Sequence, residues 1–202
     1  MSLQLCVFYK NFLSVSLYVP LCKLKNSMSQ KTKCVFLDRD GVLNEDLSDY
    51  LHKLDDLVIP EGMPEALKLL KAADFLLIVI TNQAGIAKGM YGAEAVYAIH
   101  EKMQEVSGGI LDDLYFAPSH PDFTGKSLSR KPDSLMLEKA ISKYNIDTTQ
   151  SWMIGDRARD MQAGHKVGLK TIHIIPESEV SAGDFTAVSL LEAAKIILNL
   201  PN

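Results

Sequence analysis

The sequence predicts an α/β fold, in which a central parallel β-sheet is covered by helices on both faces. Two observations predict it. Short, continuous apolar segments, typical of strands buried on both faces, alternate with segments whose apolar residues have helical spacing. Polar and charged residues also gather directly after several apolar segments, where parallel sheets bind ligands beyond the carboxyl ends of their strands.

Length and composition limit the class of protein. The chain has 202 residues, which fits one domain, and 47% hydrophobic with 23% charged residues argues against disorder. A net charge of −4 argues against general binding to nucleic acid or to a membrane through a basic surface. Three cysteines do not make a disulfide framework, and no apolar run in the body is long enough to span a bilayer. We expect a cytoplasmic monomer, since a domain of this length buries its own core.

Residues 1–27 differ from the rest of the chain. They hold only three charged residues, all lysines, and two of the three cysteines. Met28 opens a polar segment that leads into the first strand, so we interpret 1–27 as a leader or misassigned start and 28–202 as the domain. A secretory signal is one alternative, although polar residues and a proline dilute the apolar stretch; an extra strand or a partner-binding arm is another.

The first half of the body starts with a wholly apolar strand, followed by a long polar segment that contains glycine and proline. Helical spacing of apolar residues then alternates with a second continuous apolar run and a glycine-rich loop. The predicted elements are a strand at 34–37, a loop at 38–60, a helix at 63–73, a strand at 75–80, a loop at 84–92 and a helix at 93–106.

The second half continues the alternation. A loop with three prolines follows the third strand, and a Ser-x-x-Glu capping box opens the last helix at Ser189, which ends before Pro201. The predicted elements are a strand at 113–116, a loop at 117–133, a helix at 134–144, a strand at 152–154, a helix at 160–167, a strand at 170–175 and the last helix.

The strongest chemical signal is a pair of carboxylates directly after the first strand. Asp38 and Asp40 lie two residues apart, so both side chains can point to one side, and Gly41 allows a tight turn there. Two adjacent ionised carboxylates need a cation, and oxygen ligands favour Mg²⁺. One carboxylate can also attack covalently while the other transfers a proton. Taken alone, the pair fits a capped turn with solvated aspartates better.

Three further polar groups follow in the chain. Thr81 and its neighbours follow the second strand, where a hydroxyl and backbone N–H groups suit phosphoryl oxygens. Lys131 comes just before a predicted helix, whose N-terminus adds to a positive field. Asp156 follows another apolar strand and supplies a further carboxylate. Each group alone fits a helix cap or a surface charge, but their coincidence at the ends of strands in one sheet favours a phosphate site.

In this order, the four groups resemble the motifs of the haloacid dehalogenase (HAD) superfamily of phosphatases. The resemblance runs from about residue 35 to 175 and implies a Rossmann-like three-layer sandwich with a central parallel sheet. Four segments resemble more closely the D-glycero-D-manno-heptose 1,7-bisphosphate 7-phosphatases and their relatives, the histidinol-phosphate phosphatases: 36–44 (FLDRDGVLN), 80–89 (ITNQAGIAKG), 129–132 (SRKP) and 153–160 (MIGDRARD). The spacing leaves no room for a large cap domain, which fits a small phosphorylated metabolite, either a heptose bisphosphate or, as alternatives, histidinol phosphate or a broader range of small sugar phosphates.

The resemblance also implies roles for individual residues. Asp38 is the expected nucleophile and Asp40 the general acid and base, with Thr81 and Lys131 holding the phosphoryl group. Mg²⁺ is expected between the Asp38 carboxylate, the Asp40 backbone carbonyl and Asp156, while Asp160 orients Lys131 or metal-bound water. The expected substrate-binding residues are Asn44, Asn82, Gln83, Lys88, Arg130 and Arg157.

One part of the family pattern is missing. Related enzymes often carry a structural zinc loop, Cys-x-His followed by Cys-x-Cys, just before the Arg-Lys-Pro segment. In this sequence the four corresponding positions are Ala117, Ser119, Ser127 and Ser129. His120 remains, but structural zinc needs four nitrogen or sulfur ligands, so we expect no zinc. The loop then depends on Pro118, Pro121 and local packing, or is mobile, which makes the orientation of Arg130 uncertain.

Two other classes of protein share part of this pattern. A phospho-accepting receiver domain also uses carboxylates, a threonine and a lysine around Mg²⁺, but its phosphorylated aspartate stands alone after a later strand. An enzyme that has lost its activity and only binds ligands is the second alternative, although all the catalytic residue types are present here.

Overall fold

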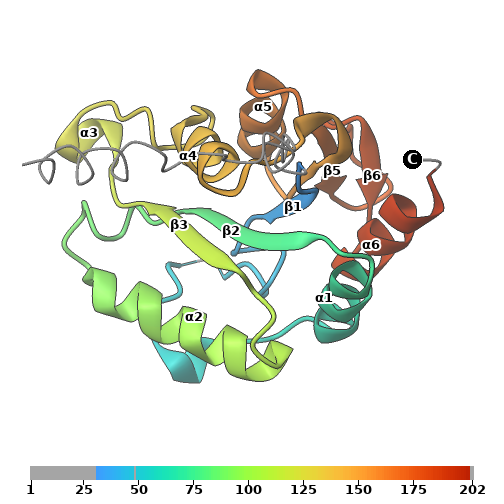
Figure 1. Ribbon diagram of the computed structural model, residues 1–202. Helices are drawn as coiled ribbons and strands as arrows, with labels where there is room; N and C mark the ends of the chain where they lie inside the picture. The colour runs from blue at the N-terminus through green and yellow to red at the C-terminus, as the bar shows by residue number, and fades with distance from the viewer. Residues whose placement is uncertain (1–30, 48, 201–202) are drawn as a thin grey trace, which may run out of the picture. The chain divides into compact units, whose positions relative to one another are not determined.

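The computed structural model describes residues 31–47 and 49–200. The prediction for residues 1–27 lies outside the described residues. A single sheet holds six strands, all parallel, in the order β3-β2-β1-β4-β5-β6 (Figure 1). The strands are β1 (Cys34–Leu37), β2 (Leu76–Asn82), β3 (Asp113–Ala117), β4 (Trp152–Gly155), β5 (Lys170–Ile174) and β6 (Phe185–Ala187).

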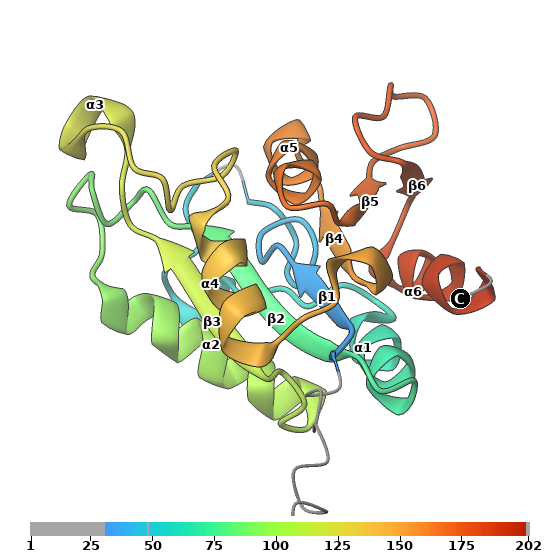
Figure 2. The same ribbon diagram turned by 45° about the horizontal axis from the view of Figure 1, so that its top comes forward.

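Helices cover both faces of this sheet, as Figures 1 and 2 show from two directions. One face carries α1 (Met63–Ala72), α2 (Ala93–Ser107) and α6 (Leu190–Asn199); the other carries α4 (Leu135–Tyr144) and α5 (Ala158–Lys166). The short helices are η2 (Leu54–Asp56), α3 (Pro121–Thr124) and η3 (Thr148–Gln150). The predicted three-layer α/β sandwich is therefore confirmed, and the described connections contain no large cap domain.

The central strand shows why the apolar runs predicted this fold. All four residues of β1 are fully buried, because successive side chains enter opposite cores. Val35 and Leu37 pack with α1, α2 and α6, whereas Cys34 and Phe36 pack with α4 and α5. A strand with helices on both faces has no solvent side, so it shows no alternation of apolar and polar residues.

Several predicted boundaries were wrong, with consequences for the site. Strand β2 continues to Asn82, so Thr81 lies within the strand, paired with β3. Helix α5 begins at Ala158 rather than Asp160, and the Asp160 carboxylate accepts a hydrogen bond from the Arg157 backbone N–H at 3.0 Å. Three short helices and the three-residue strand β6 lie in segments predicted as loops or left unassigned. Segments of three or four residues have too few positions to show a period.

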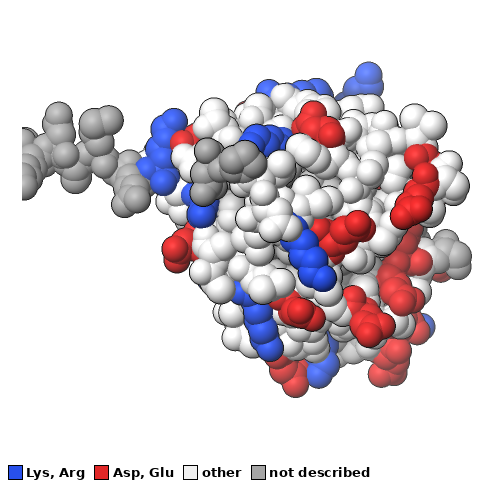
Figure 3. Space-filling model, turned by 90° about the vertical axis from the view of Figure 1, so that its right-hand side faces the viewer, with Lys and Arg blue, Asp and Glu red and all other residues white. Residues whose placement is uncertain are grey.

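The surface agrees with the low net charge. On the face shown in Figure 3, acidic side chains gather along the right-hand and lower part, and the described basic side chains there form no continuous patch. No helix within 31–47 and 49–200 is long and apolar enough to cross a bilayer.

Candidate active site

The order of the strands brings the predicted site residues together. Strand β1 lies between β2 and β4, at the point where the chain order of the sheet reverses, which is where open α/β sheets bind ligands. Asp38 directly follows β1, Thr81 lies near the end of β2, and Asp156 directly follows β4. The three side chains thus come from neighbouring strands at the carboxyl edge of the sheet.

Lys131 is the buried cation of the site. The residue is about 1% exposed. Its Nζ donates to the Ile80 backbone carbonyl at 2.6 Å and lies 2.9 Å from Asp38 Oδ1 and 2.7 Å from Asp160 Oδ1. A backbone carbonyl and two carboxylates thus surround the ammonium group. The two carboxylates raise the pKa of Lys131, although burial opposes them, so the ammonium stays charged.

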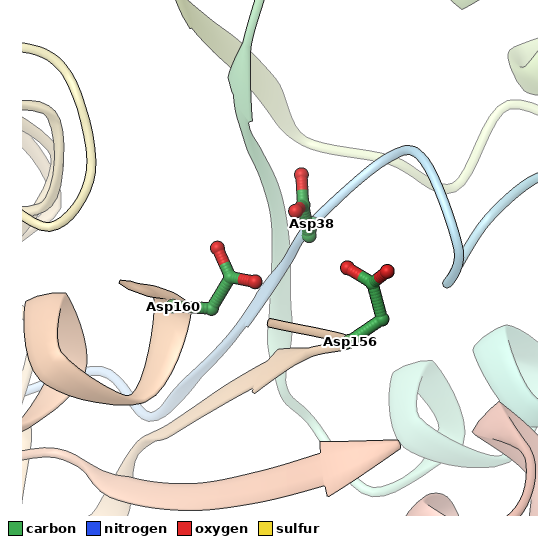
Figure 4. Close-up of side chains that lie close together, drawn as sticks. All are labelled: Asp38, Asp156 and Asp160. Carbon is green, nitrogen blue, oxygen red and sulfur yellow. The ribbon is translucent and has the colours of Figure 1, made fainter. Parts of the chain in front are cut away.

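Three carboxylates meet beside this lysine. Asp38, Asp156 and Asp160 each place an oxygen within 4.8 Å of the others, and Figure 4 shows the carboxylates directed toward a common space. Burial raises the pKa of Asp38, and burial together with the charges of Asp38 and Asp160 raises the pKa of Asp156 to about 7. The Asp156 Oδ1 atom is buried without a hydrogen-bond partner.

This arrangement fits a divalent cation. A buried carboxylate oxygen without a donor, next to a second carboxylate, is what an oxygen-preferring ion such as Mg²⁺ requires. Asp38 and Asp156 are the residues that suit it. Asp160 pairs with Lys131 and accepts from the Arg157 backbone N–H at the start of α5.

Gly41 leaves space for the carboxylate of Asp156. Its φ of +81° lies in the left-handed region, and a Cβ built there would lie 2.6 Å from the Asp156 Cγ. Any side chain at this position would displace Asp156, so the tight turn after the first strand needs glycine for two reasons.

Asp40 is held by three neighbours. The Arg39 guanidinium donates to Asp40 Oδ1 from Nε at 3.0 Å and from one Nη at 2.8 Å. The Asn44 side-chain amide donates to Oδ1 at 3.1 Å, and the Gln83 amide donates to Oδ2 at 3.1 Å. Asp40 remains partly exposed, because it also lines the adjoining cleft. A carboxylate fixed in this way and open on one side suits proton transfer.

Three predicted substrate ligands, Asn44, Asn82 and Gln83, form hydrogen bonds within the protein. Asn44 and Gln83 are almost fully buried, and both contact Asp40. The Asn82 side chain spans the Lys131 peptide: its Oδ1 accepts from the Lys131 backbone N–H at 3.0 Å, and its Nδ2 donates to the Lys131 carbonyl at 2.9 Å. Asn82 also lines the cleft, whereas Asn44 and Gln83 do not. In the structure, all three side chains therefore contact Asp40 or the Lys131 backbone.

The cleft beside Asp40 has a volume of about 380 Å³. It is lined by Asp40, Asp46, Leu47, Asp49, Tyr50, Leu51, Asn82, Lys88 and Arg159. Lys88, a predicted substrate ligand, lines the cleft, with Nζ 5.1 Å from the centroid of the Tyr50 ring. The cleft combines two cations with three carboxylates, a mixture that suits a ligand with both an anionic group and hydroxyl groups.

The two predicted substrate-binding arginines, Arg130 and Arg157, lie near the cleft but do not line it. Arg157 forms an ion pair with Asp46 and another with Asp156, at 2.9 Å from Nε to Oδ2. Arg130 donates from Nη1 to the Ser119 carbonyl at 3.1 Å. Burial, and then the charge of Arg159, lowers the pKa of Arg130.

The loop at the expected zinc position is held by hydrogen bonds. His120 caps α3 by accepting from the Asp122 backbone N–H at 3.3 Å, and the Arg130 side chain ties the loop to the chain before Lys131. The Pro118 carbonyl accepts from Ala87 N–H at 3.1 Å, which links the loop to residues 84–92. Arg130 therefore has a defined orientation in the described structure.

Sequence reasoning missed several residues at the cleft and the site. Arg39, Asp46, Asp49, Tyr50 and Arg159 were not singled out. The signal available for three of them was the unusual length and acidity of the loop after the first carboxylate pair. Nothing in the pattern indicated Arg39 or Arg159, whose side chains have to be placed in three dimensions before they reveal a role.

Comparison with known proteins agrees with this geometry. The HAD-hydrolase-like family model matches residues 128–177. A D-glycero-beta-D-manno-heptose-1,7-bisphosphate 7-phosphatase from Haemophilus ducreyi is 41% identical over 147 residues, which cover 69% of this chain and 80% of that protein. The Yersinia pestis phosphatase of the same name is 36% identical over 84% of this chain and 97% of its own length. The chain belongs to the heptose-bisphosphate phosphatase family of HAD-like hydrolases.

A solved structure supports the same assignment. The D,D-heptose 1,7-bisphosphate phosphatase from B. bronchiseptica, complexed with magnesium and phosphate, superposes with a TM-score of 0.74 and 27% identity, covering 83% of this chain and 98% of that one. The resemblance predicted from the four motifs is thus confirmed, and the chain is a phosphatase. The roles of its individual residues remain predictions.

Proposed function

We propose that this phosphatase hydrolyses the 7-phosphate of D-glycero-D-manno-heptose 1,7-bisphosphate through a phospho-aspartate on Asp38. The arrangement of Asp38 carries the proposal: its carboxylate lies 2.9 Å from Lys131 Nζ and beside Asp156, and Asp40 stands two residues further on at the cleft. A nucleophile, a fixed cation and an acid–base group therefore meet where one phosphoryl group can contact all three.

In the first step, an Asp38 oxygen attacks phosphorus and the bond from phosphorus to the sugar oxygen breaks. The electron pair leaves with the sugar oxygen, which takes a proton from the Asp40 carboxyl. In the second step, Asp40 accepts a proton from water as that water attacks phosphorus. Phosphate leaves, and the Asp38 carboxylate is restored.

Positioning and charge do most of this work. Lys131 neutralises negative charge beside Asp38, and the Thr81 hydroxyl is placed to hold a phosphoryl oxygen. A bound Mg²⁺, held by Asp38, Asp156 and the Asp40 backbone carbonyl, supplies further neutralisation of the carboxylates and the phosphoryl oxygens.

Two observations support a sugar bisphosphate as substrate. Relatives at 33–41% identity are named heptose-1,7-bisphosphate 7-phosphatases, of beta type in Haemophilus ducreyi and of alpha type in Burkholderia mallei. Lys88 and Arg159 at the cleft suit a second phosphate, and the cleft carboxylates suit hydroxyl groups. The alternative substrates are histidinol phosphate or a broader range of small sugar phosphates. A substrate with a single phosphate fits the cleft less well, because it has no second phosphate for Lys88 and Arg159 to bind.

The remaining features of the proposal concern the whole molecule. We propose a cytoplasmic monomer with one catalytic domain, in which residues 1–27 take no part in catalysis. We also propose that it works without zinc, since the four positions at the expected zinc loop hold alanine and serine, which are not zinc ligands in structural sites.

The test is phosphate release with Mg²⁺ from both anomers of heptose 1,7-bisphosphate, histidinol phosphate and common sugar phosphates. We expect a preference for a heptose bisphosphate, and loss of release in Asp38→Asn, which keeps the shape of the side chain but not its nucleophilicity. Asp55→Asn makes the same change on an exposed residue and is expected to keep full activity. An active Asp38→Asn protein would overturn the mechanism, and weak, even turnover across the panel would overturn the substrate.

A further inference from the structure

A buried amide links the cleft wall to two catalytic groups. Gln83 is about 1% exposed, although it follows the end of a strand. Its Nε2 donates to Thr81 Oγ1 at 2.8 Å and to Asp40 Oδ2 at 3.1 Å. Its Oε1 accepts from the Tyr91 hydroxyl at 2.8 Å. One side chain thus contacts the phosphoryl-holding hydroxyl and the acid–base carboxylate together.

The partners fix the orientation of this amide. An ionised Asp40 only accepts hydrogen bonds, so the NH₂ group of Gln83 has to face it. The carbonyl oxygen then faces Tyr91, whose hydroxyl has to donate. Burial raises the pKa of Tyr91 to about 12, so the phenol keeps its proton in the neutral range. The Tyr91 hydroxyl therefore donates to the Gln83 carbonyl oxygen, and the Gln83 NH₂ group donates to Asp40.

The Tyr91 ring is itself held in place. A Cβ at Gly85 would lie 2.1 Å from the Tyr91 Cε1, so the ring lies against bare backbone there. Its other neighbours include His52, with the two rings nearly parallel at 4° and their centroids 5.4 Å apart. The hydroxyl is therefore fixed by contacts that do not involve Gln83.

We propose that Tyr91 and Gln83 are positioning residues, which hold Asp40 in the orientation for protonating the leaving group and leave the Thr81 hydroxyl proton free for the phosphoryl oxygen. The proposal rests on the proposed phosphatase mechanism and extends it to residues that act through Asp40 and Thr81. Asp40 Oδ2 accepts from one Nη of Arg39 and from Gln83 Nε2, each at 3.1 Å, and of these two donors only Gln83 also contacts Thr81. Thr81 Oγ1 already accepts from Gln83, so its own O–H is available to donate.

The test compares leaving groups. The sugar phosphate is heptose 1,7-bisphosphate, which expels an alkoxide that needs a proton from Asp40. p-Nitrophenyl phosphate expels a stable phenolate that needs no proton. The value of kcat/KM reports the steps through departure of the leaving group, so it separates this role from later hydrolysis of the phospho-aspartate. General acid catalysis contributes about 100-fold or more, so a misdirected acid should cost about 10-fold with the sugar phosphate.

We expect Tyr91→Phe to lower kcat/KM for the sugar phosphate by about 10-fold and for p-nitrophenyl phosphate by less than about 3-fold. Tyr97→Phe, the same change on the exposed side of α2, is the matched control and should change neither value. Gln83→Met, which keeps the length of the side chain, should reproduce the unequal loss. It also serves as the second variant if Tyr91→Phe does not fold.

Equal losses with both substrates, or no loss with either, would overturn the positioning role. A wild-type protein that releases no phosphate from either substrate would instead overturn the proposed function itself. A measurable wild-type activity with an unchanged ratio between the two substrates in both variants refutes this inference alone.

Discussion

Removing divalent metal should make this phosphatase less stable as the pH rises from about 4 to about 7. The reason is Asp156, whose pKa is raised from 3.8 to about 7 by burial and by the charges of Asp38 and Asp160. In this window the folded form holds a proton on Asp156 while the unfolded form has released it. Rising pH therefore favours the unfolded form, and the loss is complete above the folded pKa.

The size of the effect follows from the two pKa values. The difference, 7 − 3.8, is about 3 pH units. At about 1.4 kcal/mol per unit, this amounts to roughly 4 kcal/mol of unfolding free energy as an upper bound. Three carboxyls with lowered pKa values, Asp113, Asp147 and Asp184, act in the opposite direction. Their contributions are lost only as the pH falls below the ordinary carboxyl range, so they do not cancel the loss at higher pH.

The assay is urea unfolding in EDTA between pH 5 and 8, repeated in excess Mg²⁺. Asp156→Asn removes the titrating group, so its stability in EDTA should fall less with pH than that of the wild type. Some fall should remain, because burial also raises the pKa of Asp38. Asp55→Asn is the exposed control and should behave as the wild type. Excess Mg²⁺ should reverse the wild-type loss. If Asp156→Asn and the wild type lose stability in parallel, the electrostatic reasoning is wrong.

Three further outcomes follow from the site. Lys131→Met leaves the Asp38 and Asp160 carboxylates buried beside each other without their cation. In urea unfolding at neutral pH, it should lower the unfolding free energy by about 3–5 kcal/mol. An unchanged unfolding free energy would contradict the inferred charge balance. Gly41→Ala places a Cβ against Asp156 at a left-handed φ, so calorimetry should show Mg²⁺ binding weakened by about 10-fold or more, and unchanged binding would show that the loop adapts. Elemental analysis of the purified protein should find no stoichiometric zinc, and one zinc per chain would refute the zinc-free loop.

Most of the sheet was predictable because its strands are buried on both faces. Strands such as β1 and β4 are short, fully apolar and bounded by polar residues, so their positions follow from composition alone. β6 escaped prediction because it has three residues, one of them an exposed threonine at the edge of the sheet. Its pairing depends on β5, which no local pattern in Phe185–Ala187 reveals.

The catalytic groups were predictable from topology. Parallel strands bring their carboxyl ends to one edge, so polar residues after consecutive apolar strands have to lie near one another. Asp38, Thr81 and Asp156 meet at this edge as expected, and Lys131 joins them from the loop before α4. The hydrogen-bond partners of each group were not predictable. They depend on the directions of the side chains, and the sequence indicated only where the backbone lies.

Residues 81–83 show how that direction divides the roles. Side chains two residues apart at the end of a strand lie on the same side, so Thr81 and Gln83 contact each other, and Gln83 contacts Asp40. Asn82 points to the other side, where it forms hydrogen bonds with the backbone N–H and carbonyl of Lys131. Polar atoms already bonded to catalytic groups are not available to a substrate. We therefore propose that side chains facing the cleft, above all Lys88 and Arg159, recognise the distal part of the substrate. These lie on separate segments of the chain, so specificity can change there while the groups around Asp38 stay fixed.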